Sequence, residues 1–435
     1  MNKAGILLLL IFAVNAGAQT TMTAEDAIKI GLQKNYDILI ARNNADIAQK
    51  NAGKGTAGFL PRVDAVGNAS YVSTEQETNS PFSFGDSDTR SYSGQITLDW
   101  TLFDGFRMFI NNKIYNELAE LGEVQAQYQI ENTVIGILAA YFNLVQQEQL
   151  LEVTRNTLDI SKTRLEREQV RKDLGGASSA DYLNAQVSFN NDKAAYLNQE
   201  LQVIIARKEL NILLAQDPTT EFLVDEEITV QPLQNDLETL TEMTAQRNSL
   251  LSIALKNKSI AEQNLKNSRS VFFPMLSFNA GYGYSDRSTS SENPNFREDI
   301  ETQSTDCSLG LTLIFNLFNG FQDKINYQVA QIERKNSELE VRNTLNQITG
   351  LLQEKVLTYE KEMALVALEE QDVEAAEKNL ALQQDRYNIG TASSLEFRDA
   401  QVNLARAQTA LIVAKFLAKI TRLEINQLTG SITIE

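Results

Sequence analysis

The chain has 435 residues, a formal net charge of −18 and no histidine. The acidic excess argues against nucleic-acid binding, because contacts with phosphates need clustered Lys and Arg. Without histidine the chain has no Ser-His-Asp or Cys-His catalytic site and no His-containing zinc site. Carboxylate pairs remain possible, but no sequence signature marks one, and the chain shows no phosphate loop or metal cluster. We therefore expect no enzymatic activity, no cofactor and no bound metal.

The N-terminus predicts an export signal. Lys3 precedes an apolar run from Ala4 to Val14, and Ala16-Gly17-Ala18 has the small-residue spacing of a signal peptidase site. We therefore expect residues 1–18 to be a signal peptide and the mature chain to start at Gln19. The apolar run is too short for a membrane helix, and no later segment approaches the roughly 20 apolar residues that one needs. Any membrane span must then be β.

The chain contains two copies of one unit. The segment that starts Leu174-Gly175-Gly176 reappears about 215 residues later as Ile389-Gly390-Thr391, and Phe103-Asp104-Gly105-Phe106 recurs as Phe318-Asn319-Gly320-Phe321. These matches predict an internal two-fold repeat. We expect one structural repeat over 19–216, a second over 236–430, an inter-repeat equatorial linker over 217–235 and a C-terminal tail over 431–435.

Each repeat begins with a helix and a β-hairpin. In the first, Thr23 is a good N-cap for a helix over residues 24–54, which Pro61 separates from the strands. Apolar and polar residues alternate with period two in the segments that we expect to form hairpins over 62–103 and 275–318. Strands of about 10 or more residues with one apolar face are typical of transmembrane β-barrels. An ordinary β-sandwich is the alternative for any strand taken alone.

Aromatic residues gather at one end of the predicted strands. They are Trp100, Phe103, Phe106, Phe315, Phe318 and Phe321. They predict either an aromatic girdle at the lipid interface or simple packing at the junction between strand and helix.

Long helices follow the strands. No proline interrupts residues 104–173 or 319–388, and a helix of that length spans on the order of 100 Å. Apolar residues in the first of these segments recur at steps that sum to seven, which is typical of a coiled-coil seam. They are Ile114, Leu118, Leu121, Tyr128, Ile135, Leu138, Phe142 and Val145. After a short glycine-containing turn, we expect the return helices 180–215 and 395–429.

Two hairpins supply only four strands per chain. A sheet inside a bilayer cannot leave its edges unpaired, and the smallest closed barrels have eight strands. We therefore expect an α+β membrane protein whose chains oligomerise to close one barrel, with long helices extending from it on the periplasmic side.

The chain resembles the TolC family of outer-membrane efflux and secretion channels over essentially its whole mature length. The most specific match runs from Tyr387-Asn388-Ile389-Gly390-Thr391 through Glu396 and Asp399-Ala400-Gln401 to Leu428-Thr429-Gly430. The resemblance implies a homotrimer with a 12-stranded transmembrane β-barrel in the outer membrane, continuous with a long periplasmic α-helical barrel. It also implies a periplasmic adaptor and an inner-membrane pump as partners.

The resemblance also implies site residues near the two turns. Matching positions for the acidic ring at the periplasmic entrance are Asp181, Glu396 and Asp399, although acidic residues also suit a solvated helix N-terminus. The family latch pairs a Tyr with an Arg; Tyr387 matches, but the Arg position is Ala392, so Arg386 is the candidate substitute. The residues expected at the adaptor-docking tips are Gly175, Gly176, Gly390 and Thr391.

These observations predict the exit duct of a tripartite efflux system that conducts small toxic compounds passively. Export of polypeptides by a type I system and export of metal ions are alternatives within the same family. A periplasmic coiled-coil structural protein without a pore is the alternative from another class.

Overall fold

The computed structural model describes residues 21–77, 79–80, 82–174, 178–224, 226–291, 293, 295 and 299–432. The predicted signal peptide and the tip residues Gly175 and Gly176 lie outside the described residues. The chain divides into two compact units. The helical unit comprises Met1–Ala41, Gln127–Ser249 and Asn346–Glu435, and the sheet unit comprises Arg42–Ala126 and Leu250–Leu345.

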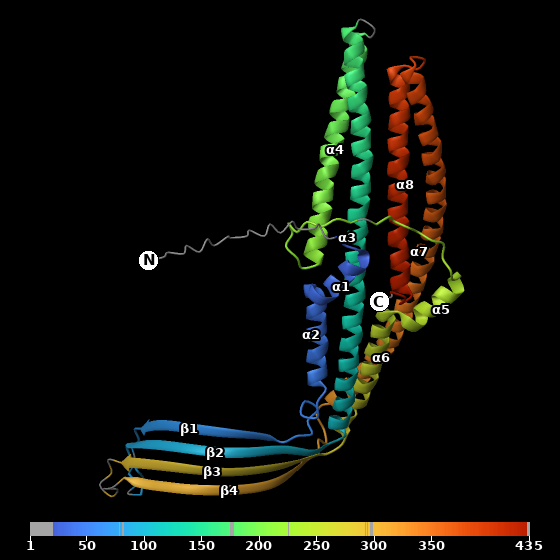
Figure 1. Ribbon diagram of the computed structural model, residues 1–435. Coiled ribbons are helices and arrows are strands. Elements are labelled where there is room, and N and C mark those ends of the chain that lie inside the picture. The colour runs from blue at the N-terminus through green and yellow to red at the C-terminus, as the bar shows by residue number, and fades with distance from the viewer. Residues whose placement is uncertain are drawn as a thin grey trace, which may run out of the picture. The chain divides into compact units, whose positions relative to one another are not determined.

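The sheet unit is built on four antiparallel strands. They are β1 (Arg62–Thr74), β2 (Ser87–Asp104), β3 (Met275–Ser291) and β4 (Ile300–Ile314), in the spatial order β1-β2-β3-β4 (Figure 1). Strands β2 and β3 come from different repeats and pair in register from Ser87 with Ser291 to Asp104 with Met275. The two predicted repeats therefore contribute two strands each to one sheet.

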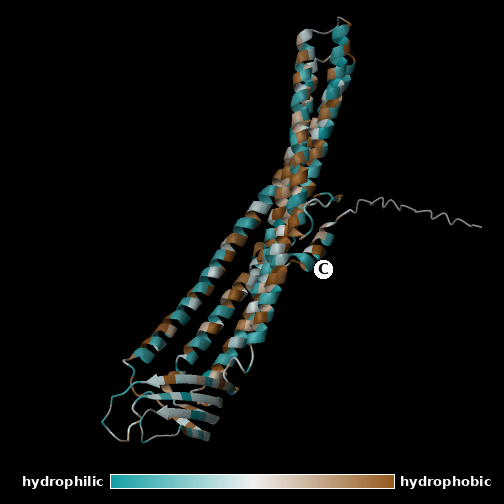
Figure 2. Cartoon of the chain, turned by 90° about the vertical axis from the view of Figure 1, so that its left-hand side faces the viewer, coloured by the Kyte–Doolittle hydropathy of each residue, from teal (hydrophilic) through white to brown (hydrophobic). Residues whose placement is uncertain are grey.

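The strands keep their apolar side chains largely outside any core of the single chain. On β4, Leu309, Leu311 and Leu313 are all about two-thirds exposed or more, and they alternate with Ser308, Gly310 and Thr312. Figure 2 shows hydrophobic and hydrophilic residues interleaved along the chain. Exposed apolar residues at every second position leave a face that an apolar environment or another chain can cover.

The single helix expected over residues 24–54 is wrong, because it is interrupted at Asn35. The structure has α1 (Ala24–Lys34) and α2 (Tyr36–Asn51), and Asn35 has extended backbone angles. The Asn35 side chain accepts hydrogen bonds from the amides of Asp37 and Ile38 and donates one to Leu213 O at 2.8 Å. The break thus starts α2 and caps the end of α4 (Ser179–Leu213).

An asparagine also separates two helices in the second half of the chain. Asn248 separates α5 (Leu237–Arg247) from α6 (Ser249–Asn267), and its side chain donates to Leu428 O at 3.1 Å. In each case an asparagine amide satisfies a carbonyl at the C-terminus of a return helix, which would otherwise have no intrahelical partner.

The helical unit contains parts of two long helical hairpins. The first is α3 (Arg107–Asp173) with α4 (Ser179–Leu213), and the second is α7 (Gln322–Asn388) with α8 (Ser394–Leu428). The long helices have 67 residues each and the return helices 35 each. Ion pairs join the two helices of each hairpin, Glu148 with Arg207 and Lys355 with Glu424.

The core of the helical unit lies where α1 and the connector 217–235 meet α3 and α4. Val134, Ile137 and Tyr141 of α3 pack with Leu210 and Leu214, and Phe222 and Ile228 of the connector join them. Of the predicted seam, Leu138, Phe142 and Val145 are in this core, whereas Leu118 is 36% exposed. Among the described residues, no helix combines the length and the apolarity that crossing a membrane requires.

Candidate gate and docking site

Both helical hairpins reverse direction at a serine that caps the return helix. Ser178 precedes α4 and Ser393 precedes α8, and each has extended backbone angles and accepts a hydrogen bond from the amide three residues later. Those residues are Asp181 and Glu396, whose carboxylates in turn accept from the serine amide and hydroxyl. The two predicted ring acids are therefore the acidic members of capping boxes.

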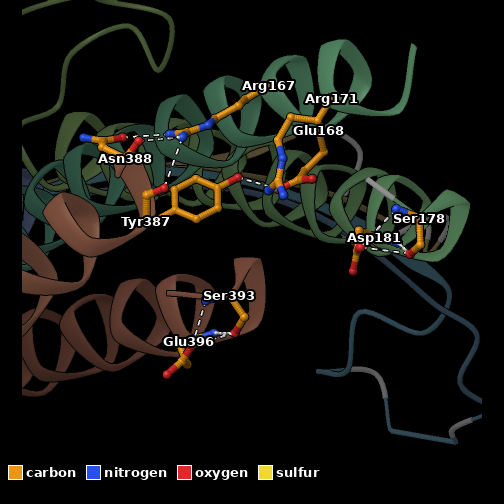
Figure 3. A network of polar contacts seen from close by, with 9 residues as sticks. All are labelled: Arg167, Glu168, Arg171, Ser178, Asp181, Tyr387, Asn388, Ser393 and Glu396. Atoms are coloured by element: carbon orange, nitrogen blue, oxygen red, sulfur yellow. Dashed lines mark hydrogen bonds and ion pairs between the residues drawn. The ribbon is translucent and has the colours of Figure 1, made fainter. Parts of the chain in front are cut away.

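The capping role leaves their charges in solvent. Asp181 and Glu396 are both exposed, and Figure 3 shows each carboxylate turned toward its own serine. The amide and hydroxyl of Ser393 hold the pKa of Glu396 below its ordinary value, because both donate to the ionised form. Asp399, one turn further along α8, is exposed as well. All three acids can thus contribute negative charge at the tips of the hairpins.

The turn of the second hairpin needs its glycine for conformation. Gly390 has φ +80°, and a side chain added there would meet nothing within 4 Å. The amides of Gly390 and Thr391 donate to Tyr387 O and Arg386 O, which is the pattern of a helix end closed by a left-handed residue. Thr391 is exposed beside it, so this tip presents a small, open surface.

Tyr387 is buried and connects α7 to α3. Its hydroxyl donates to the carboxylate of Glu168, which is fully buried (Figure 3). Its ring stacks on Phe397 with 5.0 Å between centroids. The guanidinium of Arg167 lies 4.3 Å from the centre of the Tyr387 ring and donates to Tyr387 O at 3.1 Å. It also reaches the side chain of Asn388 at 2.7 Å. Burial, followed by the hydrogen bond to Glu168, raises the pKa of Tyr387, so its hydroxyl stays a donor at neutral pH.

Arg386 lies elsewhere. Its guanidinium donates to Gln383 at 3.1 Å and to Thr391 O at 3.4 Å, and it lies 4.0 Å from Glu396. The cation that contacts Tyr387 is Arg167 of α3, so the structure brings Tyr387 together with Arg167 and Glu168 and leaves Arg386 beside the turn. In this arrangement Arg386 supports the cap of α8 instead of pairing with Tyr387.

A second contact joins the hairpins one turn into α8. Arg398 pairs with Asp192 of α4 through two hydrogen bonds of 2.6 and 2.8 Å, and the side chains are only 17% and 9% exposed. On the next turn, buried Gln401 donates to Thr157 O of α3 at 2.7 Å. A bidentate pair with little exposure orders two helices more firmly than a surface ion pair does.

A cavity of about 240 Å³ lies beside Tyr387. It is lined by Ile160, Arg164, Arg167, Tyr387, Asn388, Phe397 and three further residues. Arg164 is buried and donates to Ser188 at 2.9 Å; burial lowers the pKa of Arg164, and the like charge of Arg398 adds to this effect. Within the described part of the chain, Arg164 Nε and Glu168 Oε2 have no hydrogen-bond partner. The hairpins therefore meet through charged groups that remain incompletely satisfied.

Sequence reasoning did not identify Arg167, Glu168, Asp192 or Arg398. One signal was available on α3, where buried Ser161, Arg164 and Glu168 follow one another at steps of three and four. Charged residues that continue a helical seam must find partners, because an unpaired buried charge is costly. Nothing local predicts which helix supplies the partner.

Comparison with solved structures shows the fold. The outer-membrane channel CmeC of Campylobacter jejuni superposes with a TM-score of 0.77 at 15% identity, covering 94% of this chain and 85% of that one. The chain therefore has the fold of these TolC-like outer-membrane channels.

The family follows from sequence. Residues 27–216 and 240–431 match the family described as outer membrane efflux protein, so the chain belongs to this family and is an outer-membrane protein, as predicted. It is 19% identical to the outer membrane protein TolC of Salmonella enteritidis, covering 99% of this chain and 87% of the relative. It is 22% identical to the probable efflux pump outer membrane protein TtgC of Pseudomonas putida, covering 89% and 78%.

Proposed function

We propose that the chain is the outer-membrane exit duct of a tripartite efflux system and passively conducts small toxic compounds. In this proposal a periplasmic adaptor and an inner-membrane pump deliver the cargo, and the chain itself performs no chemistry. The observation that carries the proposal is a four-stranded sheet with two open edges in a chain whose halves both match an outer-membrane efflux family.

The open edges favour an oligomer, and the resemblance to the TolC family favours a homotrimer. Strands β1 and β4 each pair on one side only within the described chain, and lipid offers no water to satisfy the free backbone groups. Three copies would supply a 12-stranded barrel, which exceeds the smallest closed barrels of eight strands. The pseudo-two-fold repeat would then place the α3–α4 and α7–α8 hairpins of every copy around one periplasmic tunnel, with the acids near their turns at its entrance.

The proposal is tested by deleting the gene in its host and measuring both classes of cargo. Susceptibility to small toxic compounds should rise and should return to the original level when the wild-type gene is restored. If susceptibility is unchanged while a polypeptide disappears from the medium, the duct serves polypeptide secretion. A mature chain that purifies as a monomer without detergent would instead indicate a periplasmic structural protein.

The acids near the tips should set ion selectivity. The triple variant Asp181→Asn, Glu396→Gln and Asp399→Asn is expected to weaken cation preference in planar-bilayer conductance, because a ring of carboxylates attracts cations. Asp26→Asn is the matched control, since Asp26 is the acidic member of the capping box of α1 and lies away from the turns. If the ion selectivity of the triple variant is unchanged, these carboxylates do not form a selectivity ring.

Docking at the turn of the second hairpin should depend on the small size of Gly390. Gly390→Trp is expected to abolish export while trimers persist, because a bulky side chain would occupy the open surface that we assign to the adaptor. Gly390→Ala is the control, since it introduces the same strain at φ +80° with little bulk. Normal export by Gly390→Trp would contradict a docking role for this tip.

A further inference from the structure

The junctions between strand and helix are alike in the two repeats. After β2, Gly105 and Phe106 have φ of +71° and +70°, and after β4, Gly320 and Phe321 have φ of +68° and +64°. In both turns the second phenylalanine packs edge-on against one three residues earlier, with ring centroids 5.1 Å apart for Phe103 and Phe106 and 5.3 Å apart for Phe318 and Phe321. The same local structure is therefore built twice.

The surroundings of the two turns differ. A side chain at Gly105 would meet Ser270 O at 2.2 Å and Phe273 Cβ at 2.9 Å, and the ring of Phe273 lies 5.9 Å from that of Phe106. These contacts come from the segment that leads into β3, the neighbour of β2. A side chain at Gly320 would meet nothing within 4 Å.

The second junction is a hollow without an occupant from its own chain. Phe318 is 72% exposed and Phe321 64% exposed, and with Phe272 and Phe315 they line a space of about 330 Å³. Large aromatic side chains contribute most to stability when they are buried. The first junction demonstrates what covers such a turn, namely the segment before the next strand of the sheet.

No described strand is left to pair with the outer edge of β4. Strand β4 pairs only with β3 among the described strands, and β1 has the opposite free edge of the same sheet (Figure 1). Pairing β4 with β1 of a neighbour would repeat the antiparallel step between β2 and β3. The segment before β1 would then lie against Gly320 as the segment before β3 lies against Gly105.

The prolines identify the residue that would enter the hollow. Pro61 stands immediately before the first residue of β1, and Pro274 stands immediately before the first residue of β3. Leu60 is therefore the counterpart of Phe273. Leu60 is 62% exposed in the single chain, as expected of a side chain whose partner is missing.

We propose that the hollow lined by Phe318 and Phe321, beside Gly320, is a socket for Leu60 of a second copy of this chain. The inference rests on the proposed trimer and specifies how its copies join: β1 of one copy pairs with β4 of the next, and Leu60 locks their register. It also explains why a glycine with open space around it stands at position 320, since the neighbour's backbone would occupy that space.

Cross-linking tests the contact directly. In a Cys307→Ser background, which removes the exposed native thiol, Leu60→Cys with Phe321→Cys should be joined between chains by a short bis-maleimide, giving products up to the mass of three chains. Phe106→Cys with Phe273→Cys is the positive control and should be joined within one chain. Val72→Cys with Phe321→Cys is the negative control, because Val72 lies toward the other end of β1.

Oligomer dissociation in detergent provides the second measurement. Leu60→Ala and Gly320→Ala should each raise the dissociation constant of the oligomer about tenfold or more. The first removes most of the side chain that enters the socket, and the second adds a methyl group where the neighbour's backbone would lie. Gly390→Ala introduces the same kind of backbone strain in open space at the other end of α7 and should leave the constant unchanged.

The outcomes separate the socket from the trimer. A wild-type trimer that shows no link between positions 60 and 321 and tolerates Gly320→Ala would overturn the socket and leave the trimer standing. A wild-type chain that is monomeric in detergent and yields no product between chains would overturn both.

Discussion

Replacing Arg398 by alanine is expected to release the second hairpin from the first near their turns. The change leaves the carboxylate of Asp192 9% exposed and without its bidentate partner, and breaking such a buried pair typically costs about 3–5 kcal/mol. Amide hydrogen exchange in the first turns of α8 should accelerate about a hundredfold or more if opening is local. In planar bilayers the open probability of the channel should rise.

Arg207→Ala is the matched control. Arg207 pairs with Glu148 at 2.9 Å, and the two side chains are 22% and 24% exposed, but this pair joins α3 to α4 inside one hairpin. The variant Arg207→Ala should lower the free energy of unfolding without raising the open probability of the channel. The charge exchange Asp192→Arg with Arg398→Asp should restore part of the closed state. If Arg398→Ala leaves both exchange and conductance unchanged, the pair does not hold the entrance closed.

Tyr387→Phe should loosen the same end of the helices by a different route. The variant keeps the ring between Arg167 and Phe397 but removes the hydroxyl that donates to the buried carboxylate of Glu168. Leaving a buried acceptor short of a donor costs about 1–3 kcal/mol, and more when the acceptor is charged. We expect faster hydrogen exchange at the end of α7 and a smaller rise in open probability than Arg398→Ala produces.

The control for this variant lies on the same helix. Tyr359 is as buried as Tyr387, and its hydroxyl donates to Gln231 O of the connector. Tyr359→Phe removes the same group from the core of the helical unit, so it should reduce stability without affecting gating. Equal effects of the two variants on conductance would show that general destabilisation, and not the contact with Glu168, controls opening.

Much of the local structure was predictable from residue patterns. Period-two alternation located all four strands, and the absence of proline located α3 and α7 to within about three residues at their ends. Ser178 with Asp181 and Ser393 with Glu396 are readable as capping boxes, because the partners are three residues apart and their geometry is fixed by the helix itself. Acidic residues at these tips were predictable for the same reason.

Contacts between distant residues were decided only by the tertiary structure. The helix predicted over 24–54 is interrupted at Asn35, whose side chain donates a hydrogen bond to a carbonyl at the end of α4. No local sequence pattern predicts that partner. Arg167 and Glu168 meet Tyr387, and Asp192 meets Arg398, across separations of about 200 residues. Sequence periodicity determines which face of an element is apolar, since that depends on near neighbours. Which buried charge pairs with which depends on how the helices pack, and this is a property of the folded chain.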